Sequence, residues 1–204
     1  MSRTRVQGKH AGLSRRQVLR TAVGLVDAEG VAALSMRRLA RELGVEAMTL
    51  YHHVRNKEAL EDAIVEHVLA ESIREPEASD SWQEAITGYA LDLHRGLLAH
   101  PGVATLFATR PALTSRNLRE LEGLLHILTT AGFSAGTALT IVHVTASSVL
   151  GQHLTKQDEN SGDPVPGSAD LPLVNKALEA GLPGVDARMR FTLTALVTGY
   201  ESLL

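Results

Sequence analysis

The sequence predicts an all-α protein, with an N-terminal three-helix helix-turn-helix domain (residues 1–56) followed by a larger helical domain (residues 57–204). Three observations favour this fold class. Apolar residues make up 44% of the 204 residues and are mostly Leu, Ala and Val. Aromatic residues make up only 3%, a balance that suits helices better than a β-sandwich. Apolar positions recur with the helical period along most of the chain, and no segment has a convincing strand pattern.

The helices of the N-terminal part are predicted from their start and stop residues. Ser14, Ser35 and Asn56 can each accept a hydrogen bond from a backbone N–H of a first helical turn, and Gly30 and Gly44 are typical helix ends. The expected helices cover residues 14–30, 35–44, 47–54 and a longer helix from 56 to about 73.

The larger domain shows the same kind of signals. Ser81 and Glu84 have the spacing of a capping box, and His100-Pro101-Gly102 and Gly132 are expected breaks. The expected helices cover residues 81–100, 103–109, 118–132, 134–156, 173–180 and 185–204. A loop rich in Pro, Gly, Ser and Asp is expected at residues 157–172.

Charge is distributed unevenly along the chain. The net charge is −3, yet residues 1–57 carry eleven Lys and Arg against four acidic residues, a local balance of +7, whereas residues 58–204 carry −10. A basic front on an acidic body is typical of a protein that touches a polyanion with one end only. The charge pattern therefore indicates nucleic acid as a partner of the N-terminal part.

The segment from residue 35 to residue 53 has the pattern of a helix-turn-helix, whose second helix enters the major groove of DNA. We expect Arg37 to contact guanine and Tyr51 and Lys57 to contact phosphates. A generic helical hairpin with a solvated basic face is the alternative interpretation. The full set of expected DNA-binding residues is Ser35, Arg37, Ala47, Met48, Thr49, Tyr51, His52, His53 and Lys57.

The segment LSMRRLARELGVEAMTLYHHVRNKEAL (34–60) resembles the DNA-binding domain of the TetR transcriptional repressors. The motifs SWQ (81–83), TRP (109–111) and GFS (132–134) are similar to the regulatory domain of the tetracycline repressors within that family. The resemblance implies a homodimer that binds a palindromic operator on double-stranded DNA and is released by a small-molecule effector.

The resemblance also implies roles for single positions. Arg37 and the pair Ala47–Met48 match base-reading positions, and Thr49, Tyr51 and Lys57 match positions that contact the DNA backbone. His52 stands where the tetracycline repressors have Trp, and Ala47 stands where they have a base-reading Gln. We therefore expect a different operator sequence.

An effector pocket is expected among the helices of the larger domain. The candidate residues are Tyr89, Leu93, Leu106, Phe107, Thr109, Leu124 and Val142. By resemblance, Ile73, Tyr89, Leu106 and Leu124 replace polar positions that hold tetracycline and its magnesium ion, whereas Thr109 is retained. We therefore expect a largely apolar effector, no metal and no cofactor. The alternative is that these side chains fill the core.

The nine histidines do not have the spacing of a helical metal site. His94 and His100, and likewise His143 and His153, are too far apart to share one helix face. His67 and His126 fall on apolar stripes, where a core or pocket histidine is expected. Gly24, Gly88, Gly96 and Gly123 lie within helical patterns and are expected to permit close helix packing.

Two further expectations concern assembly and function class. The helices at 134–156 and 185–204 carry small and apolar residues that favour a four-helix bundle between two copies. No nucleophile-elbow, P-loop or dinucleotide motif occurs, so we expect no enzyme. The competing hypothesis is a small-molecule-binding protein or enzyme whose helix-turn-helix is vestigial.

Location is predicted from what the sequence lacks. The chain has no cysteine, hence no disulfide and no thiolate metal site. No run reaches the ~18 apolar residues that a membrane helix needs, and the polar start lacks the apolar core of a signal peptide. We expect a soluble cytoplasmic protein without membrane contact. Whether residues follow Leu204 in the natural chain stays open.

Overall fold

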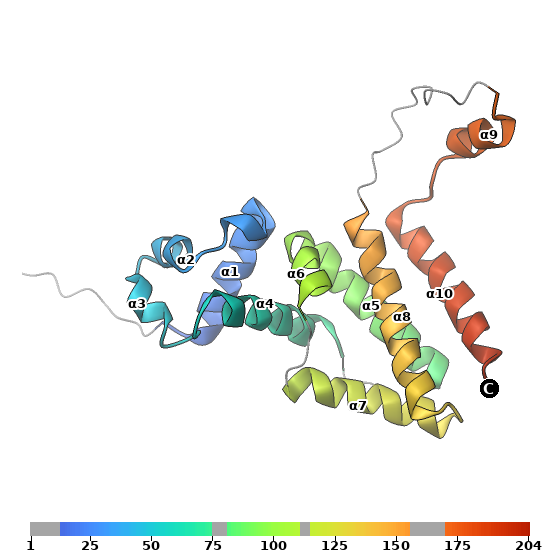
Figure 1. Ribbon diagram of the computed structural model, residues 1–204, viewed down its shortest axis with the longest axis horizontal. Helices are drawn as coiled ribbons and strands as arrows, with labels where there is room; N and C mark the ends of the chain where they lie inside the picture. The colour runs from blue at the N-terminus through green and yellow to red at the C-terminus, as the bar shows by residue number, and fades with distance from the viewer. Residues whose placement is uncertain (1–12, 75–80, 111–114, 156–169) are drawn as a thin grey trace, which may run out of the picture.

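The computed structural model describes residues 13–74, 81–110, 115–155 and 170–204. Within these ranges the protein is helical and has no strand, which confirms the predicted fold class (Figure 1). The helices are α1 (Arg15–Glu29), α2 (Met36–Leu43), α3 (Ala47–Leu50), α4 (Lys57–Ser72), α5 (Trp82–Ala99), α6 (Ala104–Thr109), α7 (Ser115–Thr130), α8 (Ala135–Leu154), α9 (Pro172–Ala180) and α10 (Val185–Glu201). Short 3₁₀ turns, η1 (Val31–Ala33) and η2 (Pro101–Val103), join α1 to α2 and α5 to α6.

The predicted helix starts are confirmed by side-chain caps. The Oγ atom of Ser35 accepts a hydrogen bond from the N–H of Arg38 at 3.1 Å, and Asn56 Oδ1 accepts one from the N–H of Ala59 at 2.8 Å. Ser14 caps α1 in the same way, and Ser81 forms the full capping box with Glu84. These contacts satisfy backbone N–H groups that have no partner inside the helix.

The helix ends agree with the predictions to within a few residues. Gly44 closes α2 in the left-handed conformation with φ 67°, and Gly30 closes α1 with φ 79°. Helix α3 is one turn long and is followed by turns rather than by helix up to residue 54. The last helix ends at Glu201 rather than at Leu204. Most of the predicted loop at 157–172 lies outside the described residues, and so do residues 1–12, where the sequence predicts a basic N-terminal arm.

Two hydrophobic cores organise the molecule. The first core joins helices α1 through α6 and also includes buried residues of α8 and α10, and Val26, Ile64 and Leu97 are fully buried in it. The second core joins α5, α7, α8 and α10 around Leu128 and Ile141. The first core continues across the predicted domain boundary at residues 56/57, since α4 packs against both α1 and α5. The boundary itself stays a prediction.

A close backbone contact joins α1 to η2. A Cβ atom on Gly102 would lie 2.4 Å from the carbonyl oxygen of Val26, so only glycine fits there. The carboxylate of Asp27 accepts a hydrogen bond from the N–H of Gly102 at 3.1 Å, and its other oxygen lies 2.8 Å from His100 Nδ1. The N-terminal helices are thereby joined to the turn between α5 and α6.

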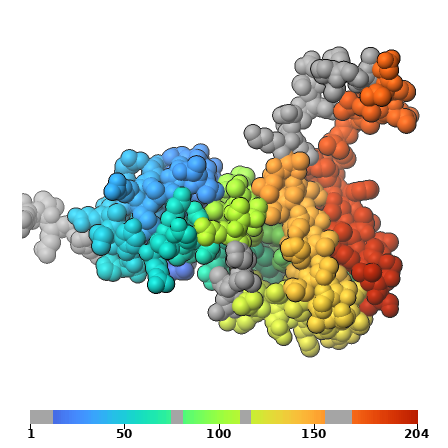
Figure 2. Space-filling model, viewed as in Figure 1, coloured from blue at the N-terminus to red at the C-terminus, as the bar shows by residue number. Residues whose placement is uncertain are grey.

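Helices α8 and α10 lie side by side at the end of the molecule opposite α3 (Figures 1 and 2). They keep large apolar side chains in solvent, among them Leu139 on α8 and Phe191 on α10, which is 77% exposed. Helix α9 has no buried residue. Among the described helices, none combines the length and apolar character needed to cross a membrane.

Candidate DNA-binding and effector sites

The turn between α2 and α3 has the geometry of a helix-turn-helix. The N–H of Val45 donates to the carbonyl of Ala40 at 3.0 Å, which closes the turn after Gly44. Leu39 and Leu50 are fully buried and hold the two helices together. The apolar side of α3 is therefore used inside the domain, and its other side faces outward.

The outward side carries several of the predicted DNA-binding residues. Met48 is 70% exposed and Tyr51 is 47% exposed, although both are side chains that proteins more often bury. Arg37 and His52 are also exposed, whereas Ala47, Thr49 and His53 are half-buried. The hydroxyl of Ser35 serves as the cap of α2.

Neighbouring arginines of α2 differ in their partners. Arg38 lies 2.5 Å from Glu29 and 2.5 Å from Glu42, and the hydrogen bonds to these two carboxylates raise the pKa of its guanidinium. Arg37 is exposed. Of the two residues, Arg37 is therefore the one available for a bidentate base contact.

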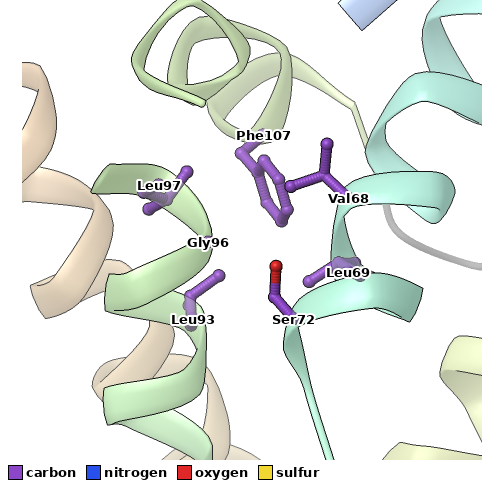
Figure 3. Close-up of a pocket in the computed structure, with 7 residues that line it drawn as sticks. All are labelled: Val68, Leu69, Ser72, Leu93, Gly96, Leu97 and Phe107. Carbon is purple, nitrogen blue, oxygen red and sulfur yellow. The ribbon is translucent and has the colours of Figure 1, made fainter. Parts of the chain in front are cut away.

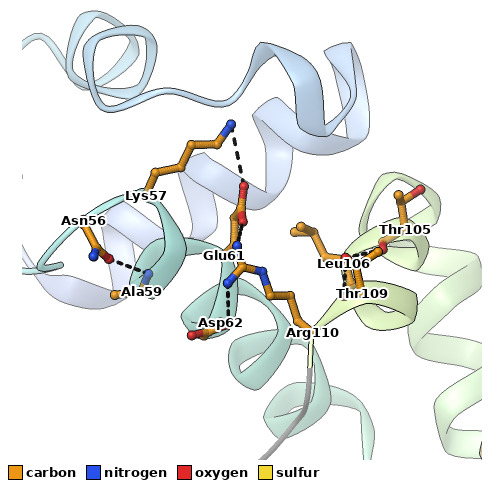
Figure 4. A network of polar contacts seen from close by, with 9 residues as sticks. All are labelled: Asn56, Lys57, Ala59, Glu61, Asp62, Thr105, Leu106, Thr109 and Arg110. Atoms are coloured by element: carbon orange, nitrogen blue, oxygen red, sulfur yellow. Dashed lines mark hydrogen bonds and ion pairs between the residues drawn. The ribbon is translucent and has the colours of Figure 1, made fainter.

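Lys57 lies at the start of α4 and has a carboxylate close by. Its Nζ atom is 3.6 Å from Oε1 of Glu61, one turn further along the helix, and its side chain is 41% exposed (Figure 4). Glu61 is in turn paired with Arg110, the residue at the end of α6. Lys57 was predicted, but neither partner was. The spacing of Lys57 and Glu61 on one helix is a local signal that could have shown their pairing, whereas the contact of Glu61 with Arg110 joins two distant helices and has no local sequence signal.

An apolar pocket lies between α4, α5 and α6 (Figure 3). About 140 Å³ lies between its side chains, open solvent included, and none of that space is wide enough for a water molecule, whereas a typical ligand site encloses ~300 Å³ or more. Leu93 and Phe107 were predicted, and the other five lining residues were not. The lining residues are Val68, Leu69, Ser72, Leu93, Gly96, Leu97 and Phe107.

Close helix contact keeps this pocket small. A Cβ atom on Gly96 would lie 2.4 Å from Ser72 Oγ and 2.8 Å from Ser72 Cβ, so α5 approaches α4 more closely than any other residue would allow. The helical pattern predicts close packing at Gly96 and also at Gly24. The expectation was wrong for Gly24, where nothing lies within 4 Å.

The other predicted effector residues do not line this pocket. Leu106 is buried in the first core, whereas Leu124 and Val142 belong to the second core. Thr109 is exposed, and its hydroxyl donates to the carbonyl of Thr105 at 3.0 Å. Tyr89 packs against both cores. Desolvation, with a smaller effect from the charge of Glu120, raises the pKa of Tyr89 to about 12.

A histidine pair that the sequence did not predict joins three helices. His94 Nδ1 on α5 lies 2.9 Å from His153 Nε2 on α8, and His94 Nε2 lies 3.0 Å from Asp186 Oδ1 on α10. Of the two histidines expected in the core or a pocket, His67 is half-buried, but His126 is exposed and that prediction was wrong. Across the described ranges, no three His, Cys, Asp or Glu side chains converge to hold a metal ion.

A short outward-facing helix after a tight turn is how helix-turn-helix proteins reach the major groove. The fold thus places this chain among the helix-turn-helix regulators. Residues 18–64 match the family model for bacterial regulatory proteins of the TetR family, and residues 75–203 match the tetracycline-repressor-like C-terminal domain. The chain therefore belongs to the TetR family of ligand-responsive transcriptional repressors.

Individual relatives span nearly the whole chain. The class A tetracycline repressor from transposon 1721 of Escherichia coli is 35% identical over 92% of this chain and 90% of its own. The structure of TetR from Acinetobacter baumannii AYE covers 94% of this chain and 98% of its own, with 30% identity and a TM-score of 0.72. Streptomyces coelicolor ActR in complex with actinorhodin covers 93% and 95%, with 26% identity and a TM-score of 0.78.

Proposed function

We propose that two copies of this chain bind a palindromic operator in the cytoplasm and that a small, largely apolar effector releases them. The observation that carries the proposal is the exposed face of α3, where Met48 and Tyr51 stand in solvent next to a basic helix. Apolar and aromatic side chains at such a place can contact thymine methyl groups and the sugar-phosphate backbone. The chain has no enzymatic role in this proposal.

Base reading is assigned to Arg37, Ala47 and Met48, with His52 and His53 beside them. Backbone contacts are assigned to Thr49, Tyr51 and Lys57, and Ser35 supports them by fixing the start of α2. This division follows from chemistry, because a guanidinium can grip a guanine edge with two hydrogen bonds, whereas hydroxyl and ammonium groups suit phosphate oxygens.

The effector is assigned to the space between α4, α5 and α6. All but one of the lining side chains there are apolar or glycine, and the exception is the hydroxyl of Ser72. Because the space is small, an effector must separate α4 from α5, and α4 begins beside the helix-turn-helix. Tyr89, Thr109, Leu106, Leu124 and Val142 become contacts only if the opening extends toward the second core. The ActR complex with actinorhodin supports a small organic molecule as the kind of ligand.

Dimerisation is assigned to the helices predicted at 134–156 and 185–204, which are α8 and α10. Their exposed apolar side chains favour burial against the same helices of a second copy, as in a four-helix bundle. A two-fold dimer can present two α3 helices to half-sites about 34–36 Å apart. One short recognition helix alone would bind weakly.

The test is selection of duplexes from a random pool, followed by binding measurements at several salt concentrations and a screen for compounds that release the DNA. The proposal expects a palindromic selected sequence, affinity that falls steeply with salt, and a sedimenting species of two chains. A vestigial helix-turn-helix would give neither a selected sequence nor salt-dependent affinity. Release only by polar, metal-chelating compounds would contradict the assignment of the effector.

A further inference from the structure

Glu61 occupies an unusual position between the two proposed sites. It is a buried carboxylate on α4 with only 7% of its surface exposed, and its two oxygens have different partners. Oε1 lies 3.6 Å from Nζ of Lys57, and Oε2 contacts Nη2 of Arg110 (Figure 4). Arg110 also lies 3.4 Å from Asp62 through its other nitrogen.

The position of Arg110 connects this carboxylate to the pocket. Arg110 ends α6, where its N–H donates to the carbonyl of Leu106 at 2.9 Å. Phe107, one turn earlier on the same short helix, lines the pocket. A molecule that displaces Phe107 therefore also displaces the guanidinium of Arg110 relative to α4.

We propose that Glu61 is a positioning residue whose carboxylate is shared by Lys57 and Arg110, so that α6 controls whether Lys57 is available to a DNA phosphate. With Arg110 in place, the charge of Glu61 is neutralised and Lys57 can extend to the DNA. Without Arg110, a buried carboxylate is left with Lys57 as its remaining cation and holds it more strongly. This inference rests on the proposed contact between Lys57 and the DNA backbone.

The salt dependence of DNA binding measures directly whether Lys57 contacts a phosphate. Each phosphate contact contributes about 0.9 to the slope of log affinity against log salt. Loss of Lys57 from both subunits of a dimer should therefore flatten the slope by about 1.8. A change that only loosened the fold would lower the affinity without this change in slope.

The experiment uses the full-length chain and the duplex selected from the random pool, with fluorescence anisotropy between ~50 and 200 mM salt. Lys57→Ala and Arg110→Gln should each flatten the slope by about 1.8, and Glu61→Gln/Arg110→Gln should restore the wild-type slope. The matched control is Arg95→Gln, since Arg95 is an exposed cation paired with Asp92 on α5 and is not in contact with Glu61. Its slope should equal that of the wild type.

The outcomes separate this inference from the proposed function. If the wild type binds DNA and Lys57→Ala flattens the slope but Arg110→Gln does not, the proposal of a shared carboxylate is wrong and the proposed DNA-binding function is retained. If the double variant stays as flat as Arg110→Gln, the inference is also wrong. If the wild-type affinity does not depend on salt, both proposals fail. Circular dichroism melting of each variant identifies any that fail to fold.

Discussion

His94 and His153 are 59 residues apart in the chain, yet their ring nitrogens lie 2.9 Å from each other where α5 meets α8. One ring must offer an unprotonated nitrogen for this hydrogen bond, since two donors cannot pair. His94 also contacts the carboxylate of Asp186, and this hydrogen bond lowers the pKa of Asp186. The contact therefore requires at least one of the two rings to be neutral.

This pairing predicts a stability that depends on pH. Burial, and to a lesser extent the charge of His94, lower the pKa of His153, and burial also lowers that of His67. Below pH ~6.5 these histidines bind protons more readily in the unfolded chain than in the folded chain. The free energy of unfolding therefore falls as the pH drops below ~6.5. The contribution that the two neutral histidines make to stability should be complete above pH ~6.5.

Urea unfolding at a series of pH values provides the measurement. His153→Gln should reduce the loss of stability on acidification, because it removes one of the two histidines whose pKa is lowered. His143→Gln is the matched control, since His143 is exposed on the same helix, and it should behave like the wild type. Equal pH profiles for all three proteins would contradict the assignment.

Two helix-interior glycines should respond in opposite ways to alanine. Gly96→Ala places a methyl group where Ser72 Oγ and Cβ already lie, and it should destabilise the fold by about 1–3 kcal/mol. Gly24→Ala meets no atom within 4 Å and should stabilise α1 by about 0.5–1 kcal/mol. Urea midpoints at one protein concentration compare them. A Gly96→Ala protein as stable as Gly24→Ala would mean that α4 and α5 are not held in this close contact.

Arg37 and Tyr51 should differ in what they contribute to DNA binding. Arg37→Ala should relax the preference at one base pair of each half-site by about 1–3 kcal/mol. Tyr51→Phe should weaken binding by the same factor for every DNA sequence, because it removes a hydroxyl assigned to the DNA backbone. Competition binding with single-base variants of the selected duplex separates the two patterns. Arg119→Ala, an exposed arginine on α7, serves as the control.

A charge on the exposed face of α10 should separate the two copies. Phe191→Glu replaces a side chain that is 77% exposed in one chain, so the isolated subunit should still fold. In a dimer the carboxylate would be desolvated against apolar side chains, which is costly. Sedimentation velocity should show single chains, and the affinity for the selected duplex should be lower than that of the wild type. The control is Leu118→Glu on α7, where Leu118 is 46% exposed, and this variant should remain a dimer. Dissociation of both variants, or of neither, would refute the assigned interface.

Local features of the fold were predictable because they depend on neighbouring residues. Ser35 and Asn56 cap the N–H groups three residues ahead of them, and Gly44 adopts a positive φ that other residues avoid. Such interactions span only a few positions, so the sequence pattern contains them. The exposed helix-turn-helix face followed in the same way, because Leu39 and Leu50 mark the side that must be buried.

Contacts between distant helices were not predictable in this way. His94 meets His153 and Glu61 meets Arg110 only because α5, α8, α4 and α6 pack at particular angles. A helical stripe did not place His126 correctly either, since α7 has more apolar residues than its buried face needs. The pocket was predicted only in part, because its position depends on the close approach at Gly96.

The pocket is lined only by residues of α4, α5 and α6, whereas the outward-facing side chains that would meet DNA lie between α2 and the first residue of α4. The two sets have no residue in common. If the proposed effector and DNA sites are as assigned, substitutions that reshape the lining should alter which molecule is recognised while the operator sequence stays the same, and the reverse should also hold. A chain divided in this way is a practical starting point for genetically encoded biosensors with independently chosen inputs and outputs.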